Sequence, residues 1–269
     1  MPQPPRNHGL GWRPSYPDYR DRRFTVDLAT LQDIPPAVDL RPQCPPIVDQ
    51  GQIGSCTACA LSAAVQFDRM KENDAPAFAP SRLFIYYNER LLDGDVANDA
   101  GSQLKTGMKS LASQGVCSEA DWPYVPTPPA YLDGPFPAGS PPVTQPPQSC
   151  YNEAVNYRAV TYQSVDQSLG QLRGALASGY PFVFGFSVYA SWYNADPLPT
   201  KIPLPSGNDS LISGHALMAV GYDDSTSLFT LHNSWGTDVG DSGYFYMPYS
   251  YVTDTNLASD FWVIQTTAG

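Results

Sequence analysis

The feature that most constrains this fold is a helix, beginning near Cys56, that is apolar on nearly every face. Two apolar stripes recur at helical spacing along residues 56–67: Ala58, Leu61 and Val65, then Ala60, Ala64 and Phe67. A helix without a polar face is stable only when other elements surround it. We therefore expect this helix at the centre of the molecule, with Cys56 in its first turn.

The patterning changes from helical to extended along the chain. Further helices are predicted at 81–92, at 102–113 (Ser102 as N-cap and Gly115 as stop) and at 166–177. Strands are predicted at 182–188, 215–222, 228–233, 243–247 and 261–266. The proline-dense stretch at 123–149 predicts a long surface loop or linker. Helices first and strands second indicate an α+β fold, which we expect to form two lobes.

The N-terminal residues differ in charge from the rest of the chain. Residues 1–23 carry +3, from five arginines and two aspartates, whereas the whole chain carries −11 and the remainder therefore −14. This complementarity favours docking of a basic leader on an acidic body. Residues 11–19 also contain more aromatic residues than is typical of a flexible tail. A disordered terminus is the alternative. We divide the chain into a leader (1–33), a helical lobe (34–150) and a mainly β lobe (151–269) whose C-terminal tail can cross back.

Composition excludes several classes of function. The isoelectric point of about 4.5 disfavours nucleic-acid and anionic-membrane partners, and no stretch is apolar enough to span a membrane. Three histidines and five cysteines without metal-ligand spacing predict no metal and no cofactor. The start has no apolar segment of a secretory signal, so we expect a cytoplasmic chain as written, with export by another route left open. We expect a monomer.

Cys56 and the segment that precedes it, residues 50–56 (QGQIGSC), suggest a nucleophile. A thiol attacks as the thiolate, and the unpaired N–H groups in the first turn of a helix lower a thiol pKa. Gly51 and Gly54 allow the loop to fold back tightly, which would bring the Gln50 carboxamide beside the sulfur. That side chain and the Cys56 backbone N–H would then form an oxyanion hole.

Two other interpretations of Cys56 remain. It can be a buried structural cysteine at a helix start. It can also form a redox pair with Cys59, since residues 56–59 read CTAC. A redox motif of this kind is expected between a strand and a helix, whereas the residues that precede Cys56 are rich in proline and glycine.

His215 is the best placed of the three histidines to act as the base. It follows a polar loop and opens a predicted strand, which would hold its ring at the edge of a cleft. Asn233, at the end of the next strand, would accept the ring N–H and fix its orientation, and Trp235 would cover that bond. His232 should point to the opposite face from Asn233 and is interpreted as structural.

Three segments in this order resemble the catalytic blocks of the papain family of cysteine proteases: 50–56, 214–216 (GHA) and 233–237 (NSWGT). The similarity begins at 34–39 (IPPAVD), which looks like the family's mature N-terminus, and runs nearly to the end. The resemblance implies a papain-like fold, with a helical left lobe, an antiparallel β-barrel-like right lobe and the active site between them. It also implies peptide-bond hydrolysis through an acyl-enzyme.

The resemblance gives each site residue a role. Cys56 takes the place of the nucleophile, His215 of the base, Asn233 of the orienting amide and Gln50 of the oxyanion donor. Substrate-facing positions are implied for Gly101, Gly214, Ala216 and the shielding Trp235. Further candidates for the pocket lining are Gly185, Ser213 and residues near Asp260.

The departures from the family pattern are also informative. Ile53 stands in place of a disulfide cysteine, and Thr57 and Val239 stand in place of tryptophans. These changes resemble a lean bacterial branch of the family, with Cys117–Cys150 as an alternative bridge.

We interpret the chain as a cysteine endopeptidase acting on peptides or proteins, with a leader over its own cleft. The alternatives are a thiol acyltransferase on the same fold and a leader-occluded binding or regulatory protein.

Overall fold

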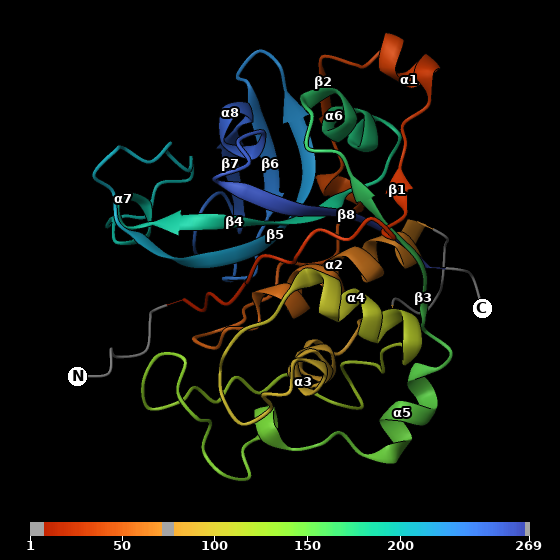
Figure 1. Cartoon of the computed structure of the whole chain (residues 1–269), viewed down its shortest axis with the longest axis vertical. Coiled ribbons are helices and arrows are strands. Elements are labelled where there is room, and N and C mark those ends of the chain that lie inside the picture. The colour runs from red at the N-terminus through yellow and green to blue at the C-terminus, as the bar shows by residue number, and fades with distance from the viewer. Residues whose placement is uncertain (1–7, 72–77, 267–269) are drawn as a thin grey trace.

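The computed structural model describes residues 8–71 and 78–266 (Figure 1). The helices in this part are α1 (Leu28–Gln32), α2 (Cys56–Lys71), α3 (Arg82–Asp93), α4 (Leu104–Ser113), α5 (Gln148–Ala154), α6 (Leu169–Ala177), α7 (Ala190–Tyr193) and α8 (Tyr249–Val252), with 3-10 turns at Arg41–Gln43 and Pro141–Val143. The strands are β1 (Arg23–Phe24), β2 (Ala37–Asp39), β3 (Ala159–Val165), β4 (Phe182–Tyr189), β5 (Leu211–Asp223), β6 (Leu228–His232), β7 (Tyr244–Pro248) and β8 (Ala258–Thr266).

The molecule has two lobes, as expected: a sheet and a group of helices (Figure 1). The strands follow the order β1-β3-β8-β4-β5-β6-β7, and β2 pairs with β5. Neighbours are antiparallel except β1 and β3, which are parallel. The expected barrel-like closure is absent from the described residues, because the end strands β1 and β7 do not pair with each other.

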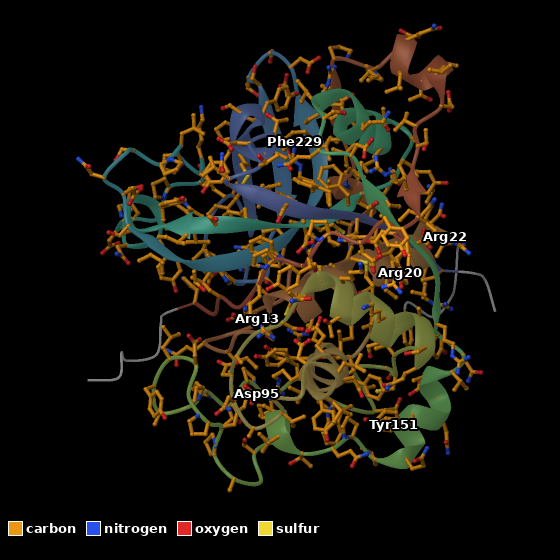
Figure 2. The ribbon with its side chains drawn as sticks, viewed as in Figure 1. Arg13, Arg20, Arg22, Asp95, Tyr151 and Phe229 are labelled. Atoms are coloured by element: carbon orange, nitrogen blue, oxygen red, sulfur yellow. The ribbon has the colours of Figure 1, made fainter. Side chains whose placement is uncertain are left out.

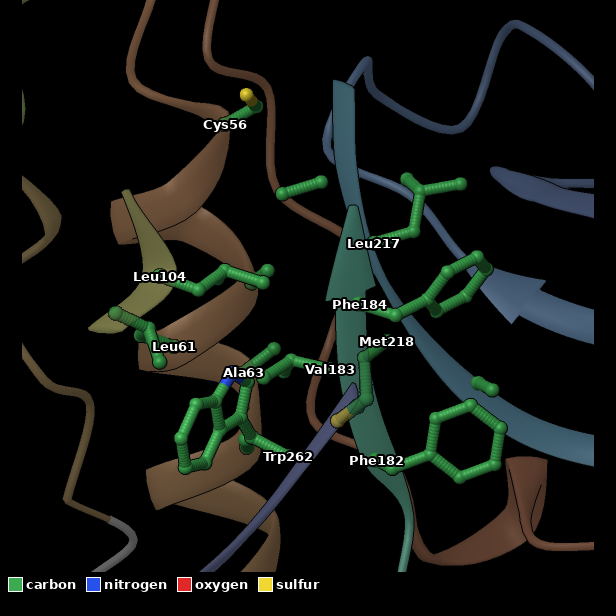
Figure 3. Close-up of a cluster of buried hydrophobic side chains, with 14 of the residues drawn as sticks. Cys56, Leu61, Ala63, Leu104, Phe182, Val183, Phe184, Leu217, Met218 and Trp262 are labelled. Atoms are coloured by element: carbon green, nitrogen blue, oxygen red, sulfur yellow. The ribbon is translucent and has the colours of Figure 1, made fainter. Parts of the chain in front are cut away.

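Helix α2 lies at the centre, as its apolar faces predict. It contacts β4, β5 and β8 on one side and α3 and α4 on the other. Nearly all of its side chains are buried, including Leu61 and Ala63. Figure 3 shows Ala63 on the side of α2 that faces the sheet, Leu61 on the opposite side and Cys56 at the end of the helix, and a Cβ on Gly107 of α4 would lie 2.2 Å from Leu61. Apolar burial on both sides of α2 therefore holds the two lobes together and fixes the position of Cys56.

Several element boundaries differ from the sequence prediction. Strand β5 begins at Leu211, so His215 lies inside a strand and not at its start. Helix α4 begins at Leu104, and Ser102 does not cap it, because Ser102 pairs with the leader and donates its hydroxyl to Asp93. The sequence analysis also missed β3 and α5.

The proline-dense stretch at 123–149 is more than a surface loop. It contains one 3-10 turn, and its Phe136 and Pro142 are buried. The fully buried guanidinium of Arg90 donates to the carbonyl of Pro142 and lies 4.8 Å from the Phe136 ring centroid. A charged helix residue therefore anchors this stretch onto the helical lobe.

Residues 8–33 of the leader run between the two lobes and then along the sheet (Figure 1). Trp12 forms a parallel bridge with Ser102, β1 extends the sheet beside β3, and α1 packs on α6. Val26 is only 3% exposed. The described leader is thus an integral part of this closed structure and not a loose tail.

The charge complementarity of the leader is realised only in part. Arg13 pairs with Asp93 at 2.7 Å and Arg23 with Asp166 at 2.9 Å, both on the body. The opposite polarity also occurs, since body residue Lys105 contacts leader residues Asp18 and Asp21 at 3.3 and 2.7 Å. Arg6 lies outside the described residues.

Candidate active site

The loop before Cys56 is held by a buried carboxylate that the sequence analysis did not identify. Asp99 accepts the backbone N–H of Gly54 with both oxygens, at 2.9 and 3.0 Å, and the Tyr86 hydroxyl at 2.6 Å. Burial raises the pKa of Asp99 to about 6. Gly51 has φ +62°, which confirms the tight turn expected there. Asp99 and Gly54 are 45 residues apart, so no local sequence pattern signals this role.

Gln50 is fixed by four hydrogen bonds, one of them from its backbone N–H to the Ser234 carbonyl at 2.8 Å. Its amide nitrogen donates to the Ile53 carbonyl at 3.0 Å, its amide oxygen accepts the Ser234 hydroxyl at 2.6 Å, and its backbone carbonyl accepts the Tyr124 hydroxyl at 2.9 Å. The leader lies directly against this amide, because a Cβ on Gly9 would be 2.7 Å from the Gln50 nitrogen. The place where an oxyanion would be bound is therefore covered by the leader backbone.

His215, Asn233 and Trp235 come together as their sequence positions indicate. The Nε2 atom of His215 lies 2.8 Å from the Asn233 side-chain oxygen, and Trp235 stacks on the imidazole with centroids 4.6 Å apart. The Nδ1 atom of His215 is buried and has no hydrogen-bond partner among the described residues. His232 points elsewhere and bonds the Pro45 carbonyl at 3.0 Å, which agrees with a structural role.

Cys56 is the first residue of α2 and lies against the strand that carries His215. The backbone N–H groups of Ala216 and of leader residue Trp12 donate toward its sulfur. Burial raises the pKa of Cys56 and lowers that of His215 to about 3, so the thiol and the imidazole are both neutral in this closed form. Water reaching the pair would favour the charged forms.

The other cysteines form no disulfide bond in this structure. Cys59 faces away toward the Ser55 hydroxyl, at 3.9 Å, and all five cysteines are free thiols. Cys117 and Cys150 interact as neighbouring thiols and are not bridged. In the described part of the chain, no cluster of histidine, cysteine or acidic side chains has the composition of a metal site. Within the same residues, no helix is long and apolar enough to span a bilayer.

The leader backbone fills the cleft between Gly101 and Gly214. The N–H groups of Gly11 and Trp12 donate to the Gly214 carbonyl at 3.0 and 3.2 Å, and Ser102 N–H donates to the Gly11 carbonyl at 2.9 Å. Gly101 has φ +63°, and a Cβ there would be 1.9 Å from the Gly11 carbonyl oxygen. Gly101 and Gly214 therefore both face the backbone of the leader.

The Trp12 indole occupies a pocket in the sheet lobe. A Cβ on Gly185 would lie 1.8 Å from the ring, so only glycine leaves room for it. Ala216 pairs with Gly185 across the two strands of this wall. The indole N–H donates to Asp260 at 3.1 Å, and Asp260 also accepts the backbone N–H of Ser15 at 2.8 Å.

The segment before Trp12 covers the other side of the site. His8 stacks on Trp235 with centroids 4.8 Å apart, and the Trp235 indole N–H donates to the Gly9 carbonyl at 3.2 Å. Trp235 therefore stacks with both His8 and His215. Cys56 and His215 are both 0% exposed beneath this leader.

A helix-borne thiol, an imidazole oriented by an amide and a nearby carboxamide in a cleft between two lobes define a thiol-dependent hydrolase. Residues 34–263 match the model of the papain family cysteine proteases. The chain belongs to the papain family and is a cysteine peptidase.

Individual relatives agree with this assignment. The chain is similar to xylellain, a cysteine protease from Xylella fastidiosa, with 47% identity over 99% of each chain and a TM-score of 0.95. It is 38% identical to an uncharacterized peptidase C1-like protein of Acanthamoeba polyphaga mimivirus, over 96% of this chain and 87% of that protein. A procathepsin B from Trypanosoma congolense shares the fold at 15% identity and a TM-score of 0.72, covering 97% of this chain and 87% of the other.

Proposed function

We propose that Cys56, His215, Asn233 and Gln50 hydrolyse peptide bonds, and that leader residues 8–13 keep the enzyme inactive until they leave the cleft. The assignment of the catalytic residues rests on the hydrogen bonding of the two ring nitrogens of His215. Its Nε2 is occupied by Asn233, whereas its Nδ1 is buried without a partner. Nδ1 is thus the nitrogen left to exchange a proton with the neighbouring thiol.

The reaction follows from these positions. Transfer of the Cys56 proton to His215 gives a thiolate and an imidazolium, and the thiolate attacks the scissile carbonyl carbon. The resulting oxyanion is stabilised by the Cys56 backbone N–H and the Gln50 amide. His215 then gives its proton to the leaving amine, which leaves a thioester on Cys56. Water hydrolyses the thioester with His215 as the base and restores the free thiol.

The leader contacts support the second part of the proposal. The leader bonds to Gly214 and Ser102, lies against Gln50, and brings the backbone N–H of Trp12 near the sulfur of Cys56. A peptide substrate would need the same space. Residues 1–33 would then act as a propeptide that precedes a catalytic body of two lobes, 34–150 and 151–269.

The test uses the full chain with Trp12→Ala, because deletion of residues 1–33 would also remove β1 and the buried Val26. We expect this variant to cleave members of a positional peptide library and to reveal which side chains it prefers. Cys56→Ala in the same background should cleave none of them. If Trp12→Ala/Cys56→Ala cleaved as well as Trp12→Ala, the assignment of the nucleophile would be wrong.

A further inference from the structure

The side chain of Arg13 occupies a site that is distinct from the Trp12 pocket. Its guanidinium donates to the Asp93 carboxylate at 2.7 Å and approaches the Gly101 carbonyl at 3.5 Å. Asp93 is further held by the hydroxyls of Ser102 at 2.8 Å and Thr106 at 3.1 Å. Figure 2 shows Arg13 where the sheet and the helices meet, on the path of the leader.

The body presents this carboxylate whether or not the leader is bound. Although the backbone at this helix end is exposed, the side chain of Asp93 is only 16% exposed. The two hydroxyls come from the body, so they keep the carboxylate in the same orientation after Arg13 leaves. Of the hydrogen-bond donors described here, Arg13 supplies the only positive charge to it.

The position of Asp93 makes a cationic partner favourable for a separate reason. Asp93 is the last residue of α3, whose C-terminal end carries a partial negative charge. A carboxylate at this end is repelled by the helix dipole, and a cation beside it is attracted by both.

We propose that the open cleft selects peptides with an arginine in the Arg13 site, next to the residue that fills the Trp12 pocket and on the side away from Cys56. This inference rests on the proposed peptidase function. The leader shows that an extended backbone bonded to Gly214 and Ser102 can direct one side chain to Asp260 and the adjacent one to Asp93. Arginine fits better than lysine, because a guanidinium offers several N–H donors to the carboxylate and the carbonyl together.

The experiment compares two fluorogenic peptides that differ only at this position, where one has arginine and the other citrulline. Citrulline keeps the shape of arginine and replaces its charge by a neutral urea. The enzyme is the full chain with Trp12→Ala and Arg13→Ala, so that the leader no longer fills either site. We expect kcat/KM to be about tenfold higher for the arginine peptide, as for a partly buried charge-assisted hydrogen bond.

The ratio of the two kcat/KM values identifies the residue responsible. Asp93→Asn should bring the ratio close to one. The matched control is Asp95→Asn. Asp95 lies two residues further along the chain (Figure 2) and accepts a hydrogen bond from Asn98 at 2.7 Å, so its substitution should leave the ratio of the two kcat/KM values unchanged. Equal turnover of both peptides by the parent, or an arginine preference that survives Asp93→Asn, would overturn the inference. Failure to cleave either peptide, with Cys56 unreactive to an epoxide reagent, would instead overturn the peptidase proposal itself and the inference with it.

Discussion

Substitution of Trp12 by alanine tests whether the leader controls access to Cys56. Trp12 is 7% exposed and fills the space above Gly185, and its N–H is one of two leader donors to Asp260. The alanine variant loses this ring and its hydrogen bond, while the body stays unchanged. The closed form should therefore be weakened relative to an open form in which the cleft is free.

The size of the effect follows from the burial of the ring. Replacing a buried tryptophan by alanine costs about 3–5 kcal/mol. With the lower figure, about 3 kcal/mol, the population of the open form rises about 100-fold, since each 1.4 kcal/mol is a factor of ten. The gain in activity should approach this factor as long as the open form is still the minor one.

The assay follows the second-order rate at which an epoxide thiol reagent modifies Cys56, together with kcat/KM for a fluorogenic peptide. The matched control is Tyr19→Ala, which removes a leader aromatic that is 98% exposed and should change neither rate. Circular dichroism checks that both variants are folded. Equal labelling rates for Trp12→Ala and the parent would show that the leader does not limit access, and the reasoning would fail.

Three further predictions concern the ion pairs that hold the leader on the body, the amide of Asn233 and the dependence on pH. Lys105→Met removes the body cation between Asp18 and Asp21 and should speed Cys56 labelling a few-fold, as for a largely buried ion pair. Lys109→Met, at an exposed position on the same helix, should leave the rate unchanged. Asn233→Ala leaves the Nε2 atom of His215 without its hydrogen-bond partner and should lower kcat/KM of the Trp12→Ala enzyme by about 10–100-fold. This is the range known for the loss of a residue that orients a metal-binding histidine. An unchanged kcat/KM would remove Asn233 from the mechanism. Burial lowers the pKa of His215 to about 3 in the closed form, against about 6.5 for an exposed histidine, so the open form binds the proton more tightly. The closed form should therefore lose stability as the pH falls below about 6.5, and His8, whose pKa is lowered by burial, acts in the same direction. Asp260, whose pKa burial raises, acts in the opposite direction. Under conditions in which the Trp12→Ala variant is mostly open, its labelling rate no longer depends on opening, so the ratio of parent to variant labelling rates should rise between about pH 7 and about pH 5. A flat ratio under these conditions would contradict this linkage.

The parts of this fold that follow from local patterns were predictable. The all-apolar helix could be placed only at the centre, and α2 lies there with Cys56 at its start. His215 and Asn233 come together because β5 and β6 are neighbouring antiparallel strands, and consecutive strands usually pair.

The parts that depend on long-range contacts were not predictable in the same way. Ser102 reads as a helix cap, but Asp93 and the leader bind it instead. Asp99 is distant in sequence from Gly54, and no local pattern predicts that its carboxylate would hold the nucleophile loop. The aromatic character of the leader suggested that it docks, but the contact of Trp12 with Gly185 became visible only in three dimensions.

Substrate recognition is also hard to predict from the sequence, because it depends on contacts between residues that are far apart in the chain. Asp93 ends a helix and Asp260 lies in the last strand, yet adjacent leader residues contact both of them. Neither carboxylate stands in one of the three catalytic segments. The proposed recognition sites therefore rest on the contacts of the leader and not on the segments that identify the family.

The central claim is that Cys56 forms a covalent intermediate during hydrolysis. The most direct measurement is the mass of the Trp12→Ala enzyme, quenched with acid while it turns over a slowly hydrolysed ester, followed by peptide mapping in the Cys59→Ser background. We predict one acyl group, on the peptide that contains Cys56, which disappears as the ester is consumed. Turnover without an acylated enzyme, or an acyl group on any other residue, would contradict this account.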